Sequence, residues 1–230
     1  MEGKKGSVTP FRYSISIYLE YTSILFIYIS DPVIHDILIQ NMTILNMNDY
    51  KIREALCHYM DYVYCDKFRI IDELVIGKAR ADIVIVKDRL IGYEIKGDTD
   101  TYKRLPGQIK EYDLYFQENY LVVGAVNIKT AAKHVPSYWG IMYFSETENG
   151  LIHIETVRKA ETSPKFNLRK QLSLLWRKEL NHILKANSLS KCSGKNKAYI
   201  AKYLLGCVPQ NILQKQICEE LLERDWTFYK

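Results

Sequence analysis

In this sequence of 230 residues, two acidic residues and one lysine are spaced so that they could form a catalytic site. Glu94 and Lys96 are two positions apart in an apolar, β-branched run, so on a strand both side chains point to the same face. Asp82 lies in the preceding β-branched run. If residues 87–89 form the turn of a hairpin, Asp82 faces Glu94 across the two strands. Lys96 is then the next residue on the same face of the second strand.

Two neighbouring carboxylates repel each other unless a cation lies between them. Carboxylate oxygens suit Mg²⁺ or Mn²⁺, which keep several waters and can meet a phosphate. A lysine beside such a metal can position or deprotonate the attacking water and offset charge in the transition state. Asp82, Glu94 and Lys96 therefore suffice for metal-assisted hydrolysis of a phosphodiester. Without the upstream aspartate, a Glu-x-Lys pair on a strand is usually only a solvated ion pair.

Other charged residues near this group have two interpretations each. Glu54 and Glu73 are candidate accessory ligands of the metal, but Glu54 could instead face solvent on a helix. Glu73 could instead form an ion pair with Lys78 or Arg80. Arg80 and Arg104 are candidate contacts to the phosphates of a nucleic acid, and ion pairing with nearby acids is the alternative.

The elements that must position these residues follow the order α-β-β-β-α-β. A helix between the third and fourth strands makes a β-α-β crossover, so a mixed α/β sheet is the economical architecture. The chain beyond residue 166 shows helical spacing of its apolar residues. The predicted elements are a helix from residue 48, strands over 68–76, 81–86 and 90–95, a helix from 100 to about 118, strands over 120–126 and 138–144, and helices over 168–184, 198–205 and 212–222.

The net charge of +5 is unevenly distributed along the chain. Residues 165–230 hold 13 Lys and Arg against 5 Asp and Glu, whereas residues 1–164 hold 19 against 22. Lys191, Lys195 and Lys197 surround a Ser/Gly/Asn segment between two predicted helices. We expect these lysines to contact DNA phosphates, which gives salt-dependent affinity without sequence preference. A solvated loop is the alternative.

We expect three parts in the chain: an N-terminal extension over 1–46, a core over 47–160 and a basic helical subdomain over 161–230. The extension contains an apolar run over 14–30, which Glu20 interrupts. A membrane span needs about 20 apolar residues, so extra strands or a buried helix are favoured over an anchor. A translation start near the beginning of the core is a further alternative for this extension.

Five cysteines occur, an odd number, and no two are spaced as Cys-x-x-Cys. Without a clear secretion signal, this pattern favours reduced thiols in a cytoplasmic protein. It also disfavours a structural zinc site.

The order helix, strand, Asp82, Glu94-x-Lys96, helix resembles the PD-(D/E)XK nuclease superfamily, which has a restriction-endonuclease-like core. The wider pattern resembles a mostly uncharacterised bacterial nuclease-like family of the "sce" type, akin to the MmcB DNA-repair proteins. The resemblance covers roughly residues 48–185, and its first acid lies in Arg-Ala-Asp rather than Pro-Asp. Its segments are Glu73-Leu74, Ala79-Arg80-Ala81-Asp82-Ile83, Gly92-Tyr93-Glu94-Ile95-Lys96, Asp98, Asp100, Arg104-Leu105, Gln108-x-x-x-Tyr112 and Pro136-x-x-Trp139-Gly140.

The resemblance implies specific roles for the residues of the central motif. Asp82 and Glu94 would bind Mg²⁺ (or Mn²⁺), with the carbonyl of Ile95 as a third ligand. Lys96 would be the catalytic lysine.

Gln108 and Tyr112 are similar to the Q-x-x-x-Y motif of RecB-like nucleases. Their i, i+4 spacing on a helix points both side chains the same way, toward the site or the DNA backbone. An ordinary polar helix position for Gln108 and a core edge for Tyr112 are the alternatives.

The leading functional expectation is a metal-dependent nuclease that hydrolyses DNA phosphodiester bonds in repair, mobile-element or phage-defence processes. One alternative is a catalytically silent module that keeps the nuclease-like fold to bind nucleic acid. Another is a nuclease that acts on RNA. DNA is the expected partner and a membrane is not, and the sequence leaves open a homodimer or a partner protein.

Overall fold

The computed structural model describes residues 50–147 and 151–226 of the chain. The chain divides into two compact units, Met1–Met47 and Asn48–Lys230, and every described residue belongs to the second unit. The strands or helix predicted for the N-terminal extension therefore lie outside the described residues.

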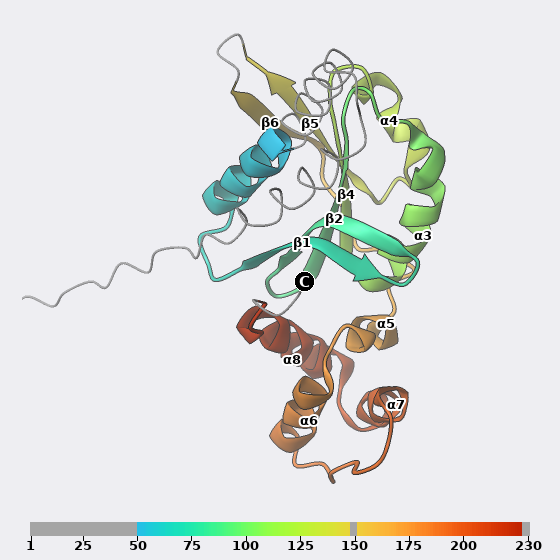
Figure 1. The fold of residues 1–230 in the computed structure, drawn as a ribbon. Helices are drawn as coiled ribbons and strands as arrows, with labels where there is room; N and C mark the ends of the chain where they lie inside the picture. Colours follow the sequence, from blue (N-terminus) through green and yellow to red (C-terminus); the bar gives the residue numbers. More distant parts are fainter. Residues whose placement is uncertain (1–49, 148–150, 227–230) are drawn as a thin grey trace, which may run out of the picture. The chain divides into compact units, whose positions relative to one another are not determined.

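Six strands form one mixed sheet in the order β1-β2-β3-β4-β5-β6 (Figure 1). Neighbouring strands are antiparallel except that β4 is parallel to both β3 and β5. The predicted mixed α/β class is confirmed. The strands are β1 Arg69–Ile76, β2 Ala79–Val86, β3 Leu90–Lys96, β4 Glu118–Val123, β5 Gly140–Glu146 and β6 Ile152–Arg158.

Helices precede, connect and follow the strands. A helix over residues 50–63 comes before β1, the connection from β3 to β4 contains a short 3-10 helix and an α-helix, and the connection from β4 to β5 contains one α-helix. The remaining helices follow β6. Besides the first helix they are the short η1 Tyr102–Arg104, α3 Leu105–Tyr115, α4 Ile128–His134, α5 Leu168–Ser173, α6 Arg177–Ala186, α7 Lys197–Cys207 and α8 Gln210–Glu223.

The single helix predicted over 168–184 is wrong, because the chain breaks between α5 and α6. Trp176 has extended backbone angles, and its N–H donates to the Glu179 carboxylate at 2.6 Å. A carboxylate in the first turn that accepts from the residue before the helix is a strong start signal. The prediction also omitted α4 and β6, both of which are only seven residues long.

The hairpin of β2 and β3 has the register that the sequence predicted. Lys87 donates to the carbonyl of Arg89 at 3.0 Å in the turn, and Val86 pairs with Leu90. The regular ladder continues to the pair Ile83–Tyr93. Asp82 and Glu94 are the next residues along the two strands.

Both faces of the sheet are buried. The helix over 50–63 covers one face, with Leu56 and Met60 fully enclosed. The opposite face packs against α3, and the same apolar core continues through the C-terminal helices. At Gly92 on β3, a Cβ atom would lie 2.4 Å from the ring of Phe116. The absent side chain therefore allows the end of α3 to lie directly on the sheet.

The C-terminal helices contact the edge of the sheet at which β3 and β4 begin. Gln171 of α5 donates to Gln117, just before β4, at 2.8 Å. Arg69, the first residue of β1, donates to the carbonyl of Leu222 in α8 at 2.9 Å. The ends of β3 and β4 thus lie at the other edge of the sheet.

All five cysteines are free thiols. Burial raises the pKa of Cys57 and of Cys218 to about 12 each, so neither thiol ionises at neutral pH. Among the described segments, no helix combines the length and hydrophobicity that crossing a membrane requires.

A buried ion pair joins the last helix to the rest of the C-terminal helices. Arg224 donates to both carboxylate oxygens of Glu179, at 2.8 and 2.6 Å, and both side chains are almost completely buried. The rings of Trp176 and Trp226 lie 4.5 and 4.7 Å from the guanidinium. Removing one partner leaves the other charge buried and unpaired.

We expect Glu179→Gln to lower the free energy of unfolding by about 3–5 kcal/mol, the cost of breaking a buried pair. Urea unfolding followed by circular dichroism measures it. The matched control is Lys215→Ala, which removes an exposed pair with Glu219 at 3.9 Å and should change stability by less than about 1 kcal/mol. Equal stability of Glu179→Gln and the wild type would contradict the expectation.

Candidate active site

Glu94 is a carboxylate with no exposure to solvent, on the face of β3 that α3 covers. Its Oε1 accepts from the Lys96 ammonium and, at 2.6 Å, from the Gln108 amide. Its Oε2 accepts from the Tyr112 hydroxyl at 2.8 Å. Burial and the nearby Asp82 charge raise the pKa of Glu94, and the Lys96 charge opposes this rise.

Asp82 lies beside Glu94 and is held through both its side chain and its backbone. Its Oδ2 accepts from the backbone N–H of Ile95 at 2.8 Å, across the hairpin. Its own N–H donates to the Tyr112 hydroxyl at 3.2 Å. One hydroxyl from α3 therefore connects the backbone of β2 with the carboxylate of β3. Asp82 is close enough for its charge to raise the pKa of Glu94, but the regular pairing ends at Ile83–Tyr93 and the Asp82 carboxylate bonds to the backbone of Ile95.

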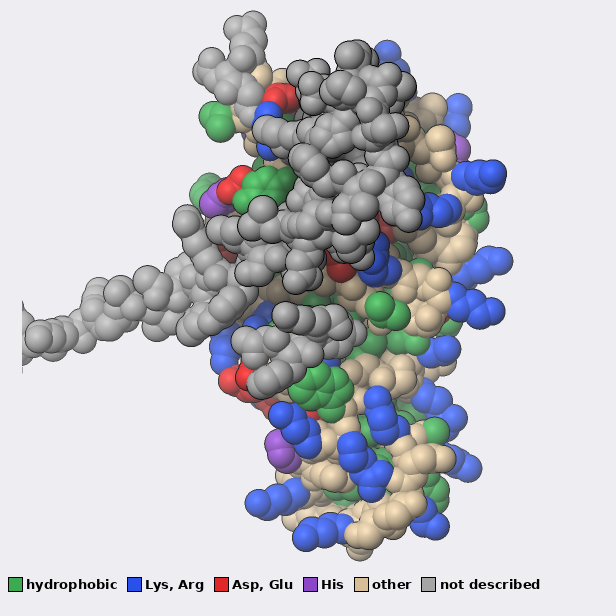
Figure 2. Space-filling model, in the orientation of Figure 1, with side chains coloured by type: hydrophobic (Ala, Val, Ile, Leu, Met, Phe, Trp, Pro, Cys, Tyr) green, Lys and Arg blue, Asp and Glu red, His purple; other side chains and the backbone are tan. Residues whose placement is uncertain are grey.

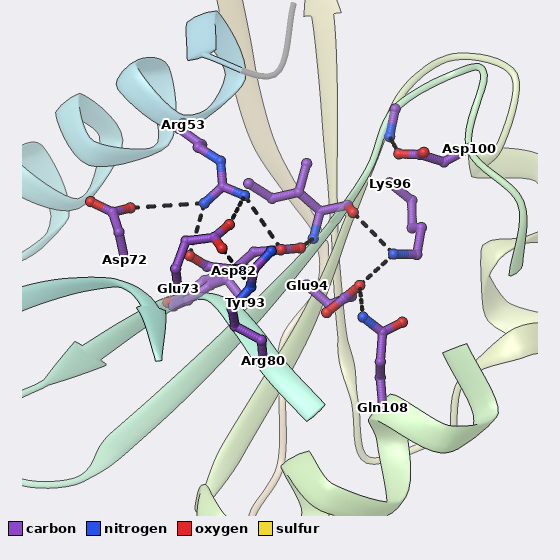
Figure 3. Close-up of polar contacts among 12 residues, drawn as sticks. Arg53, Asp72, Glu73, Arg80, Asp82, Tyr93, Glu94, Lys96, Asp100 and Gln108 are labelled. Carbon is purple, nitrogen blue, oxygen red and sulfur yellow. Dashed lines mark hydrogen bonds and ion pairs between the residues drawn. The ribbon is translucent and has the colours of Figure 1, made fainter. Parts of the chain in front are cut away.

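The Lys96 ammonium lies between two of the three oxygens implied as metal ligands. It contacts Glu94 Oε1 and the carbonyl oxygen of Ile95, the latter at 3.4 Å (Figure 3). These two oxygens are therefore engaged by a cationic side chain of the protein. Within the described residues, no group of three or more His, Cys, Asp or Glu side chains is arranged to hold a metal. A metal here would have two carboxylates, one carbonyl and water as ligands, which suits Mg²⁺.

Arg53, which the sequence analysis did not select, is a central residue of this site. It reaches from the helix over 50–63 to the backbone carbonyl of Asp82 at 2.9 Å and to Asp82 Oδ1 at 3.3 Å (Figure 3). It also contacts Glu73 at 3.1 Å and Asp72 at 3.9 Å. The only sequence signal was indirect: three acids that converge on one hairpin need a compensating cation.

Glu73 occupies a left-handed backbone conformation, with φ of +56°, in the middle of β1. It lies opposite Asp82, between the regular pairs Asp72–Ile83 and Leu74–Ala81. Its carboxylate also accepts from Arg80 at 2.5 Å. A non-glycine residue in this region costs about 1–3 kcal/mol and persists only where its surroundings fix it. Here ion pairs with two arginines hold the strained residue next to Asp82.

Other residues proposed from the sequence are not all part of this group. Glu54 is exposed on its helix, and its side chain makes no hydrogen bond or ion pair with a described residue. Arg104 is exposed at the start of α3. Asp98 and Asp100 accept from backbone N–H groups of nearby loops, those of Val126 and Gly97 respectively.

The lysines of the C-terminal part that are proposed to bind DNA lie in or between helices at the opposite edge of the sheet from Glu94. Lys191 and Lys195 are in the connection between α6 and α7, and Lys197 begins α7. These helices belong to the group that contacts the beginning of β4, whereas Glu94 lies near the end of β3. Lys197 donates to the carbonyl of Ser173 at 3.2 Å, and Lys195 lies over the ring of Tyr199. Their role in DNA binding stays a prediction.

Comparison with known proteins links this chain to a phage protein family. The family described as Bacteriophage P4 protein cII matches residues 42–227, which is most of the chain. A relative, Protein cII of Enterobacteria phage P4, is 30% identical over 117 residues. That alignment covers 50% of this chain and 44% of the relative, so the chain spans less than half the relative's length. No solved structure matches the chain.

We expect Arg53→Ala to lower the free energy of unfolding by about 1–3 kcal/mol, because it leaves partly buried carboxylates without their partner. Chemical denaturation measures the change. Lys51→Ala is the matched control on the same helix, since its pair with Glu146 is more exposed. This control should cost less than about 1 kcal/mol. If the two variants lose the same stability, Arg53 is not the main counterion of the acids.

Proposed function

This chain belongs to the Bacteriophage P4 protein cII family, and we propose that it is a Mg²⁺-dependent nuclease with a restriction-endonuclease-like core. The observation that carries this proposal is the group of the buried Glu94 and Lys96 with the partly buried Asp82 at the junction of β2, β3 and α3. An uncompensated carboxylate inside a protein is costly. A chain that needed only a stable sheet could fill these positions with apolar residues.

The residues present fit a hard divalent cation. Asp82, Glu94 and the carbonyl of Ile95 would hold Mg²⁺, or Mn²⁺ in its place. When bound, the metal would lower the pKa of a water and neutralise negative charge on a phosphate.

The side chains around this position have separate tasks in hydrolysis. Water attacks phosphorus, the bond from phosphorus to one ester oxygen breaks, and that oxygen takes a proton. The Lys96 ammonium can orient the attacking water and offset charge on the phosphate oxygens. Gln108 Oε1 is buried and has no hydrogen-bond partner among the described residues, so it is available to accept from a water. Tyr112 and Arg53 keep the carboxylates in place.

DNA is the proposed substrate. The phage origin of the relative favours a role in a mobile element over roles in DNA repair or phage defence. A silent nucleic-acid-binding module is the alternative from a different class. It offers no reason to keep Glu94 buried with three donors. RNA is the alternative substrate for the same chemistry.

Cleavage assays test the activity directly. We expect the wild type to cut DNA with Mg²⁺ or Mn²⁺ but not with EDTA. Lys96→Met should lower the rate at least about 100-fold, because it removes the group that positions the water. Glu94→Gln should abolish cleavage through loss of a metal ligand. The rates are read on linear and circular, single- and double-stranded DNA.

Glu155→Gln is the matched control for this assay, because it removes an exposed carboxylate on β6 and should leave the rate unchanged. Cleavage that survives both Lys96→Met and Glu94→Gln would place the active site elsewhere. DNA binding without any cleavage by the wild type would favour the silent module, and cleavage of RNA alone would favour the other alternative.

Metal binding is tested independently by thermal unfolding. A ligand that binds only the folded state at 100 times its Kd adds about 2.7 kcal/mol of stability. Saturating Mg²⁺ should therefore raise the Tm of the wild type, and the rise should disappear in Asp82→Asn. Glu155→Gln should keep the full rise. An equal rise in wild type and Asp82→Asn would show that Mg²⁺ binds at other residues.

A further inference from the structure

We propose that four exposed cations at one edge of the sheet bind the sugar–phosphate backbone of double-stranded DNA. This basic rim consists of Lys103 and Arg104 of η1 and Lys129 and Lys133 of α4. The inference rests on the proposed nuclease function for its substrate class.

The order of the chain places the rim beside the candidate active site. η1 follows the end of β3, and α4 follows the end of β4. Because β3 and β4 are parallel neighbours, both connections leave the same edge of the sheet. Glu94 and Lys96 lie at the end of β3, at this edge. Ligands of open α/β sheets bind at the carboxyl ends of parallel strands.

Contacts between η1 and α4 join the two halves of the rim into one surface. The rings of Tyr102 and His134 are stacked, with centroids 3.9 Å apart. The Tyr102 hydroxyl donates to the carbonyl of Asn127 at 3.3 Å. The Asn127 amide in turn donates to the carbonyl of Gly97, just after β3, at 2.9 Å. The four cations are therefore carried on a surface fixed at both ends of α4.

Within the part of the chain that the structure describes, the charge of the rim is not compensated by acidic side chains. Neither η1 nor α4 contains an acidic residue, and across residues 50–147 and 151–226 no carboxylate forms an ion pair with any of the four cations. Lys129 and Lys133 are four residues apart, so they share one face of α4. Figure 2 shows Lys and Arg side chains gathered along the side of the molecule that carries α3 and α4.

The candidate active site cannot attract a polyanion without help. Four carboxylates surround it, from Asp72, Glu73, Asp82 and Glu94, and its three cations are engaged with them. Phosphates approaching this edge therefore need cations that remain available. Lysines and arginines that neutralise phosphates give strong, salt-dependent and sequence-independent binding. The rim supplies such cations next to the acids.

The test measures binding of a short DNA duplex in EDTA, by fluorescence anisotropy, at several salt concentrations. We expect Lys129→Ala/Lys133→Ala to weaken binding about tenfold at moderate salt. It should also reduce the slope of log affinity against log salt by about one for each lysine. Lys103→Ala/Arg104→Ala should behave in the same way. Circular dichroism checks that each variant is folded.

Lys159→Ala is the control, since it removes an exposed lysine that follows β6 at the opposite edge of the sheet. It should keep wild-type affinity and slope. The proposal is overturned if the rim variants bind like the wild type, if the control loses as much affinity, or if the wild type binds no duplex.

Cleavage by the same proteins separates this proposal from the nuclease proposal. Loss of binding in the rim variants with no cleavage by the wild type would refute the nuclease and support the surface. Cleavage by the wild type with unchanged binding by the rim variants would support the nuclease and refute the role of the rim.

Discussion

Glu94 places a carboxylate in a part of the sheet that water does not reach, and the neighbouring side chains are positioned to donate hydrogen bonds to it. Lys96, Gln108 and Tyr112 donate to its two oxygens, and two of these three come from α3. The helix can lie close enough only because Gly92 leaves room for it. A buried charge without such partners would cost more than a domain of this size can tolerate.

The topology divides the molecule into two edges with different tasks. At the edge where β3 and β4 begin, α5 and α8 extend the apolar core and close it through hydrogen bonds and ion pairs. At the other edge, the hairpin acids lie near the connections that leave the ends of β3 and β4. Chemistry at that edge can depend on loops and cations that contribute little to the core, because stability is provided elsewhere.

Much of this arrangement could be predicted from local rules. The three-residue turn at 87–89 set the register that brings Asp82 to Glu94, and helical spacing directed Gln108 and Tyr112 toward the sheet. The contact of Arg53 could not be predicted, because it depends on the angle at which the helix over 50–63 packs on the sheet. The left-handed Glu73 depends on ion pairs with residues far away in the sequence, and helical apolar spacing continues through the break before α6, so neither could be predicted from local patterns.

The ammonium of Lys96 between Glu94 and the carbonyl of Ile95 has a consequence for the metal-free protein. Sites built only from acids depend on a metal to relieve their repulsion, and chelators can unfold the proteins that contain them. Here a covalently attached counterion is already in place. Glu94 therefore stays compensated when no divalent ion is present, and the proposed nuclease activity would depend on the metal without the fold depending on it.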